Sequence, residues 1–205
     1  MDTTTLAAFL AVDLLLVFTP GADWAYAISA GLRERSVVPA VTGLVAGHGA
    51  HALVAVAGLS VIVAGSPAAL TALTVAGAGY LLWLGWGVLR QPAVPTVAAE
   101  SADASRVQVM LKGAGISGLN PKALLLYFAL FPQFMDSADG WPVAVQTGLL
   151  SMLHLTACAG VYLAVGVMAR TVLRTRPSAA RIVTRISGAM MIAIGAFLLV
   201  ERLAG

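Results

Sequence analysis

Charged residues are scarce in this sequence. Only 10% of the 205 residues are Asp, Glu, Lys or Arg, while 60% are hydrophobic. Soluble domains contain about 25% charged and about 45–50% apolar residues, so a water-soluble fold could not bury this much apolar surface. The composition therefore predicts an integral membrane protein, and the chain is too short to carry a separate soluble catalytic domain as well.

Cysteine is almost absent. The single Cys158 excludes an intrachain disulfide, a CxxC motif and a thiolate metal cluster. An H-E-x-x-H metalloprotease motif is also missing, because the two residues between His48 and His51 are Gly49 and Ala50. We therefore predict that the protein is not an intramembrane enzyme and that it needs no cofactor.

Long apolar stretches dominate the rest of the chain. A membrane-spanning helix needs about 20 mostly apolar residues. Six stretches qualify, at residues 6–31, 37–64, 68–89, 111–135, 141–169 and 182–203. Residues 91–110 include a stretch rich in proline, alanine and serine, which predicts a flexible linker between a first unit, 1–90, and a second, 111–205. We expect an all-α membrane protein with six transmembrane helices, three in each unit.

Positive charges alternate along the chain. They lie beside the links that follow the first, third and fifth apolar stretches, and the links after the second and fourth contain no Lys or Arg. Because cytoplasmic loops carry the positive excess, this pattern predicts a bacterial inner-membrane protein with both termini outside and a cytoplasmic linker. Topology and contact with anionic membrane lipid account for the net charge of +3, so we expect no nucleic-acid partner. The residues concerned are Arg33, Arg35, Arg90, Arg106, Lys112, Arg170, Arg174, Arg176 and Arg181.

Two apolar stretches are interrupted at matching positions. The first contains Pro20 and Gly21, and the fourth contains Asn120 and Pro121. Proline removes a backbone donor and clashes with the preceding turn, so both helices should be broken near the middle of the bilayer. Each interruption lies in the first helix of its unit, and two units of three helices must be related by inverted topology. In transporters built this way, broken helices surround a central binding site.

Ionisable side chains are concentrated at a similar depth. Asp23 and Lys122 lie beside the two interruptions. A charge inside a membrane is costly unless it is paired or hydrated, so both residues are functional candidates, and the alternative is a structural ion pair that holds the two units together. His48 and His51 are three residues apart, so they share a helix face, and histidine titrates near physiological pH. We therefore expect this pair to handle protons. The roles of Asp13 and His154 stay open, since Asp13 could also extend toward the outer surface and His154 could form an interhelical hydrogen bond.

A small-residue motif precedes the two histidines. Gly43 and Gly47 form a GxxxG motif, which lets another helix approach closely. The partner helix can belong to the same chain or to a second copy, so the motif is compatible with a homo-oligomer.

The order of these motifs resembles the LysE/RhtB family of amino-acid exporters. Pro20-Gly21-Ala22-Asp23 is similar to the Pro-Gly-Pro-Asp of that family, and Asn120-Pro121-Lys122 is similar to its Asn-Pro-Lys motif. The resemblance implies efflux of amino acids or related metabolites, driven by the proton-motive force. Ala22 replaces the second proline and should soften the first break, and His48 stands where the family often has an acid, which leaves the chemistry there open. Further similarity covers residues 43–51, 77–85, 131–134 and 187–195.

Together, these features lead to the hypothesis of a site for a zwitterion between the two units. The substrate carboxylate would bind Lys122 and the half-helix N-termini, and its ammonium group, or an exchanged proton, would bind Asp23. The alternative is a divalent-metal exporter that uses His48, His51 and His154. The predicted substrate-binding residues are Pro20, Gly21, Asp23, Asn120, Pro121 and Lys122, and the predicted proton-coupling residues are Asp23, His48 and His51.

Overall fold

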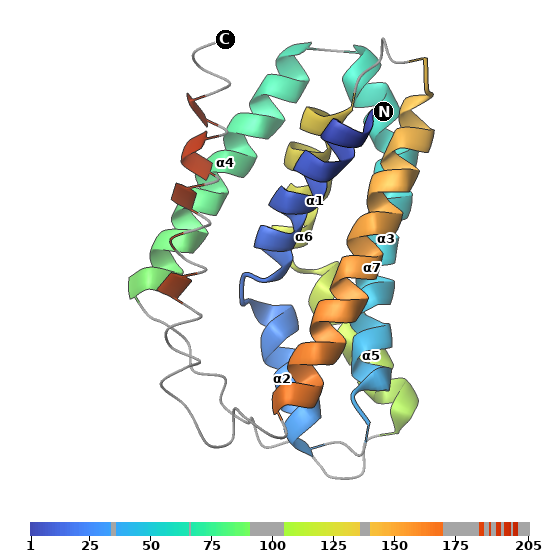
Figure 1. The fold of residues 1–205 in the computed structure, drawn as a ribbon, viewed down its shortest axis with the longest axis vertical. Helices are drawn as coiled ribbons and strands as arrows, with labels where there is room; N and C mark the ends of the chain where they lie inside the picture. Colours follow the sequence, from blue (N-terminus) through green and yellow to red (C-terminus); the bar gives the residue numbers. More distant parts are fainter. Residues whose placement is uncertain are drawn as a thin grey trace.

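The computed structural model describes residues 1–33, 36–65, 67–90, 105–135 and 140–169, and scattered residues between 185 and 200. Within the continuous ranges every regular element is a helix, as the composition predicted (Figure 1). These elements are α1 (Thr3–Val17), α2 (Ala22–Arg33), α3 (Val38–Gly65), α4 (Pro67–Arg90), α5 (Arg106–Gly118), α6 (Pro121–Leu125), the π-helical turn η1 (Leu126–Leu130), the 3₁₀ turn η2 (Phe131–Phe134) and α7 (Val143–Met168).

The predicted apolar stretches correspond to these helices. By length and composition, the part of α3 from Val38–Gly58 and the whole of α7 can each cross a membrane. Two bent pairs, α1 with α2 and α5 with the segment Lys122–Phe134, can each form one further span. The third predicted stretch coincides with α4. Most of the sixth stretch, 182–203, and linker residues 91–104 lie outside the described residues, so the count of six transmembrane helices stays a prediction.

Helix α5 begins at Arg106, before the apolar stretch 111–135. The division into units 1–90 and 111–205 stays a prediction. A capping box explains the difference: the backbone N–H of Ser105 donates to the side chain of Gln108 at 2.8 Å, and the N–H of Gln108 donates to Ser105 Oγ at 3.3 Å. These polar residues stabilise a first turn that a search for apolar residues overlooks.

Both predicted helix breaks are present. The chain bends by 60° between α1 and α2 and by 59° between α5 and the segment that follows it. At the first break, Trp24 Nε1 donates to the carbonyl of Val17 at 2.8 Å, which satisfies one of the acceptors at the end of α1. At the second, Pro121 begins α6, where its missing N–H costs nothing. Ala22 has therefore not removed the first break.

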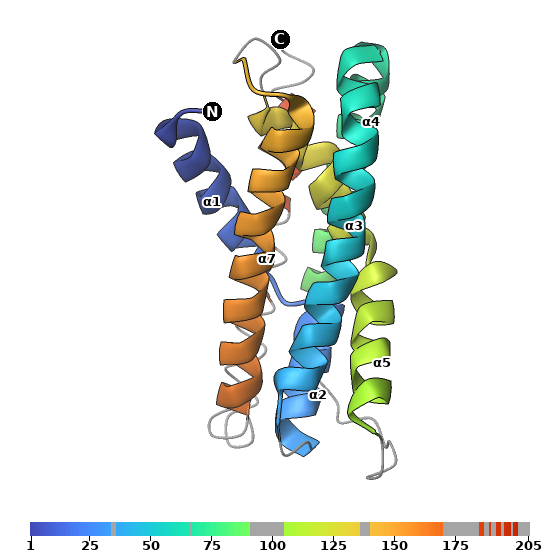
Figure 2. The same cartoon turned by 90° about the vertical axis from the view of Figure 1, so that its right-hand side faces the viewer.

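The two broken segments run in opposite directions. In Figures 1 and 2, α1 and α2 descend from the N-terminal end of the molecule, whereas α5 and α6 ascend. The lower end of the molecule carries the end of α2 at Arg33 and the start of α5 at Arg106. Opposite directions are what an inverted relation of the two units requires.

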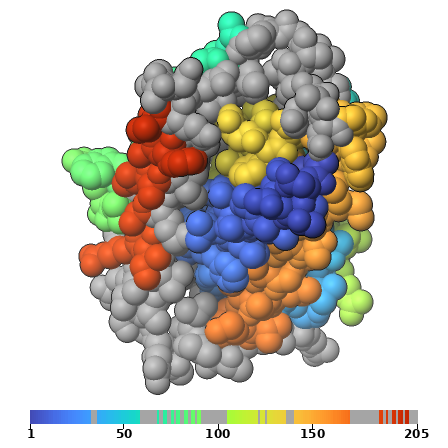
Figure 3. Space-filling model, turned by 45° about the horizontal axis from the view of Figure 1, so that its top comes forward, coloured from blue at the N-terminus to red at the C-terminus, as the bar shows by residue number. Residues whose placement is uncertain are grey.

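Two apolar clusters lie above and below the breaks. The upper cluster joins α1 to η1 and η2, where the ring of Phe131 packs edge-on against Phe9 at 5.3 Å between centroids. The lower cluster joins α2, α3 and α7, and includes Ala27, Leu44 and Val161. The space-filling view shows the upper arrangement from outside, with α1 lying between the yellow segment around η1 and the orange α7 (Figure 3). Polar groups at the level of the breaks are thus enclosed between two apolar layers.

The GxxxG motif of α3 packs against α5 of the same chain. A Cβ at Gly47 would lie 2.6 Å from the carbonyl oxygen of Ala114, and one at Gly43 would overlap the carbonyl oxygen of Met110. Gly113 on α5 faces back, because a Cβ there would lie 2.8 Å from the carbonyl oxygen of Ala40. The motif is used inside the chain, so it no longer supports a homo-oligomer.

We predict that Gly47→Ala destabilises the protein by about 1–3 kcal/mol, because the added methyl group forces α3 away from α5. The measurement is the midpoint of thermal unfolding of the purified protein in detergent. Gly49→Ala is the matched control on the same helix, because a Cβ there would meet nothing within 4 Å. Equal midpoints for the two variants would show that the close approach of α3 and α5 contributes no stability.

Candidate functional site

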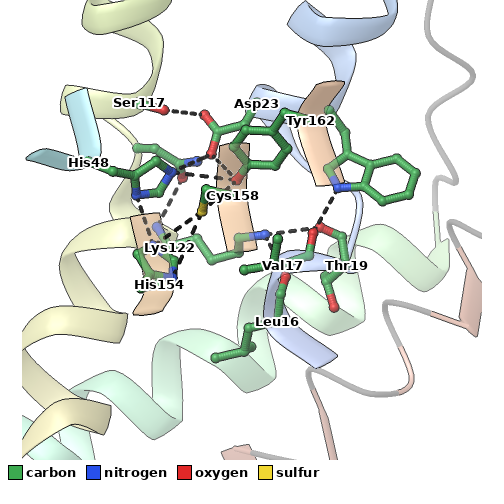
Figure 4. Close-up of polar contacts among 12 residues, drawn as sticks. Leu16, Val17, Thr19, Asp23, His48, Ser117, Lys122, His154, Cys158 and Tyr162 are labelled. Carbon is green, nitrogen blue, oxygen red and sulfur yellow. Dashed lines mark hydrogen bonds and ion pairs between the residues drawn. The ribbon is translucent and has the colours of Figure 1, made fainter. Parts of the chain in front are cut away.

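Lys122 joins the two helix breaks. Its side chain is 9% exposed and extends from α6 to the end of α1 (Figure 4). The ammonium group donates to the carbonyl oxygens of Leu16, at 3.1 Å, and Thr19, at 2.9 Å. A helix C-terminus carries partial negative charge and unpaired carbonyls, which a cation stabilises. The break between α1 and α2 therefore provides the carbonyl oxygens that bind the ammonium group of Lys122, which lies at the break between α5 and α6.

Asp23 lies in the first turn of α2 and is 1% exposed. Ser117 Oγ donates to its Oδ1 at 2.9 Å, and Asn120 Nδ2 and the hydroxyl of Tyr162 each donate to its Oδ2 at 3.1 Å. His48 Nε2 lies 3.2 Å from the same Oδ2 (Figure 4). A buried carboxylate is tolerated only when hydrogen bonds replace its hydration, and here four elements supply them.

The helix N-termini at the two breaks already have polar partners. The side chain of Asn120 caps α6 by accepting a hydrogen bond from the backbone N–H of Lys122 at 3.1 Å. The carboxylate of Asp23 stands in the first turn of α2. A substrate carboxylate would have to compete with these groups, so its binding to the half-helix N-termini stays a prediction.

The structure connects His48 to His154. Nδ1 of His48 lies 3.2 Å from Nε2 of His154, and the two rings meet edge-on with centroids 4.9 Å apart. Nδ1 of His154 in turn lies 2.7 Å from Oδ1 of Asp13. Asp13 is 0% exposed, so it does not extend toward the outer surface as one sequence alternative allowed.

His51 lies apart from this connection. It is buried, its ring is tilted by 43° to that of Tyr127 with centroids 5.9 Å apart, and its Nδ1 has no hydrogen-bond partner. The structure therefore brings His48 to a histidine on another helix and does not pair it with the neighbour on its own helix. A role of His51 in proton coupling stays a prediction.

Potential metal ligands do gather near the centre, but they are already engaged. Ligand atoms of His48, His154 and Cys158 lie within 4.8 Å of one another, and in the described part of the chain His51 does not belong to this group. The facing nitrogens of the two histidines form a hydrogen bond, and Cys158 Sγ lies 3.4 Å from Nε2 of His154. A metal would have to displace these contacts, so we do not assign a metal site.

The cavity beside Lys122 is small. It measures about 20 Å³ and is bordered by His48, Lys122, His154 and Tyr162 on its polar side. Leu16 and residues of η1 border its apolar side. Such a volume holds about one water molecule, whereas the smallest amino acid has five non-hydrogen atoms. In this conformation the cavity therefore has no room for a molecule of that size.

Sequence reasoning missed three contributors to the site. Ser117 and Tyr162 donate to Asp23, and Cys158 contacts His154. On α7 a signal was present, because His154, Cys158 and Tyr162 are spaced by four and so share one helix face. Ser117 carried no comparable signal, since its role depends on how α5 packs against α2.

Comparisons with known proteins identify relatives of this chain. A family model described as LysE type translocator matches residues 14–202. An uncharacterized membrane protein of Vibrio cholerae is 32% identical over 74% of this chain and 76% of its own. The homoserine/homoserine lactone efflux protein of Salmonella typhimurium is 28% identical over 74% of this chain and 77% of its own, and the leucine efflux protein of an Enterobacter species is 29% identical over 59% of each chain.

No solved structure matches the chain. The family model nevertheless covers both helix breaks and the helices that carry Asp23, His48, Lys122 and His154. Relatives of similar length are named as membrane proteins and as efflux proteins for amino acids. The chain is therefore a membrane protein that belongs to the LysE type translocator family.

Proposed function

We propose that this protein is a secondary transporter of the bacterial inner membrane that exports amino acids or related small metabolites in exchange for protons. The observation that carries the proposal is the burial of opposite charges, Asp23 and Lys122, at two helix breaks that meet inside the protein. Related proteins named as homoserine and leucine efflux proteins support the substrate class.

The two charged groups match the two ends of an amino acid. The substrate carboxylate would take the ammonium group of Lys122 from the carbonyls of Leu16 and Thr19, and the substrate ammonium would bind Asp23. Gly21 lies next to the ammonium group of Lys122, since a Cβ added at Gly21 would be 3.8 Å from Nζ of Lys122. Pro20, Asn120 and Pro121 shape the breaks that hold these groups in place.

Proton exchange follows because a proton and the substrate ammonium group compete for the carboxylate of Asp23. When the site faces outward, a proton that binds the carboxylate removes its charge and releases the substrate ammonium. The empty carrier then returns, loses the proton to the cytoplasm and binds the next substrate. This cycle needs two conformations of the kind found in transporters with alternating access.

The orientation in the membrane is part of the same proposal. We place both termini outside and the end of α2 and the start of α5 inside, with the units 1–90 and 111–205 related by inverted topology. Arg33 and Arg106 at one end of the molecule support the orientation, because positive residues favour the cytoplasmic side. The opposite directions of the two broken segments support the inversion.

We predict that proteoliposomes with the wild-type protein release one class of preloaded, labelled amino acids when a pH gradient is imposed. Asp23→Asn should lower this efflux by roughly tenfold to a hundredfold, because a hydrogen bond to a charged group contributes about 1.5–3 kcal/mol and the amide cannot take a proton. Tracer release with and without the gradient is the measurement, for a panel of amino acids.

Asp2→Asn is the matched control for this experiment. Asp2 caps α1 from the molecular surface, and asparagine caps a helix equally well. Its efflux should equal that of the wild type. Full efflux by Asp23→Asn would contradict the site, and no efflux of any amino acid by the wild type would contradict the substrate class and direct attention to the metal-ion alternative.

We also predict that Lys122→Ala lowers efflux at least tenfold and lowers the unfolding midpoint in detergent. The change removes the partner of the substrate carboxylate and leaves the carbonyls of Leu16 and Thr19 without their donor, at about 1–3 kcal/mol for a buried group. Arg106→Ala, at the exposed start of α5, should change stability by no more than about 0.5 kcal/mol. Unchanged efflux by Lys122→Ala would remove this residue from the substrate site.

A further inference from the structure

Four ionisable side chains form one continuous series of hydrogen bonds. Oδ1 of Asp13 lies 2.7 Å from Nδ1 of His154, and Nε2 of His154 lies 3.2 Å from Nδ1 of His48. Nε2 of His48 lies 3.2 Å from Oδ2 of Asp23. Each imidazole uses both nitrogens, and the four residues come from α1, α7, α3 and α2. We call this series the Asp13–Asp23 chain.

All three contacts can be hydrogen bonds at once only when this chain holds one additional proton. Each of its three contacts joins two atoms that both accept hydrogen bonds, so each contact needs one hydrogen. Two neutral imidazoles supply one N–H group each, and two carboxylates supply none. The third hydrogen must therefore come from a proton shared by the chain. It resides on a carboxyl group or completes an imidazolium.

The charge of Lys122 matches this count. Two carboxylates and one additional proton leave the chain with a single negative charge, and the buried ammonium of Lys122 balances it. Without the proton, one negative charge would stay uncompensated in an apolar interior, which is costly. The other titratable groups that face the chain are the thiol of Cys158 and the hydroxyl of Tyr162 on α7, Tyr127 on η1, and His51 on α3.

The two ends of the chain lie on opposite sides of the first helix break. Asp23 follows the break and belongs to the proposed substrate site, whereas Asp13 precedes it on α1, which lies at the molecular surface (Figure 3). Oδ2 of Asp13 is buried and has no hydrogen-bond partner. A buried polar atom without a partner is rare and calls for an explanation. A carboxyl oxygen that receives and releases a proton provides one.

We propose that Asp13 is the group through which the exchanged proton enters from outside, and that His154 and His48 transfer it to Asp23. A proton on Asp13 passes to Nδ1 of His154, the hydrogen on Nε2 of His154 passes to Nδ1 of His48, and the hydrogen on Nε2 of His48 passes to Asp23. Each imidazole gains one N–H bond and loses one, so every contact keeps one hydrogen. The inference rests on the proposed export function and assigns its proton path.

The test separates proton coupling from substrate binding. One measurement is efflux driven by a pH gradient, and the other is exchange of labelled for unlabelled amino acid at equal pH, which needs no net proton movement. Asp13→Asn should lower gradient-driven efflux at least tenfold and leave exchange within about twofold of the wild type, and His154→Gln should also lower gradient-driven efflux at least tenfold. Asp13→Glu keeps a carboxyl group and should retain most of the coupling, and Asp2→Asn is the control.

Gradient-driven efflux at the wild-type rate in Asp13→Asn would overturn the proposal while leaving the export function intact. Loss of exchange together with efflux in both Asp13→Asn and Asp13→Glu would assign Asp13 a structural role and would also overturn it.

A second measurement does not depend on any substrate. In the purified protein with ¹⁵N-labelled histidine, Asp13→Asn should shift the ring nitrogen resonances of both His154 and His48, because the shared proton leaves the chain. Asp2→Asn should shift neither. A response confined to His154 would show that the proton is not shared along the chain. Should the protein export no amino acid, this experiment still decides whether the chain shares a proton.

Discussion

The contact between the ammonium group of Lys122 and the carbonyl oxygens at the end of α1 is the interaction on which the centre of the protein depends. A broken helix inside an apolar protein leaves backbone acceptors that water cannot reach, and a buried lysine needs acceptors of its own. The α1–α2 break thereby supplies acceptors for the lysine, and the α5–α6 break supplies a donor for the free carbonyls. The same breaks place Asp23 among donors from three other helices and from the α5–α6 junction.

Close helix packing restricts how this centre can open. Gly47 and Gly113 hold α3 against α5, and a Cβ at Gly166 on α7 would lie 3.0 Å from the carbonyl of Ala27 on α2. Each of these pairs combines a helix from before residue 90 with one from after residue 105. Moving the two sequence units apart as rigid bodies would break both contacts. The glycine at the α1–α2 break, Gly21, makes no such close approach, because a Cβ there would lie 3.8 Å from Nζ of Lys122.

The identity of residue 48 fits the polar network around it. The resemblance to LysE/RhtB exporters indicated that an acid is frequent at this position. An acid here would face the carboxylate of Asp23, and only one of the two could stay charged at this distance. An imidazole instead accepts on one side and donates on the other, so His48 links Asp23 to His154. This difference makes a hydrogen-bond path to Asp13 available in this chain.

The sequence by itself determined the helices, the two breaks and the burial of charge near them. These features depend on local properties, namely apolar length, the missing donor of proline and the cost of a charge in apolar surroundings. Only the tertiary structure decided the partners: Ser117 and Asp23 are 94 residues apart, and Asp13 and His154 are 141 apart. Contacts of this kind depend on how helices pack and rotate against one another, which no local pattern encodes. For the same reason, the sequence paired His48 with His51, whereas in the structure the histidine that contacts His48 is His154.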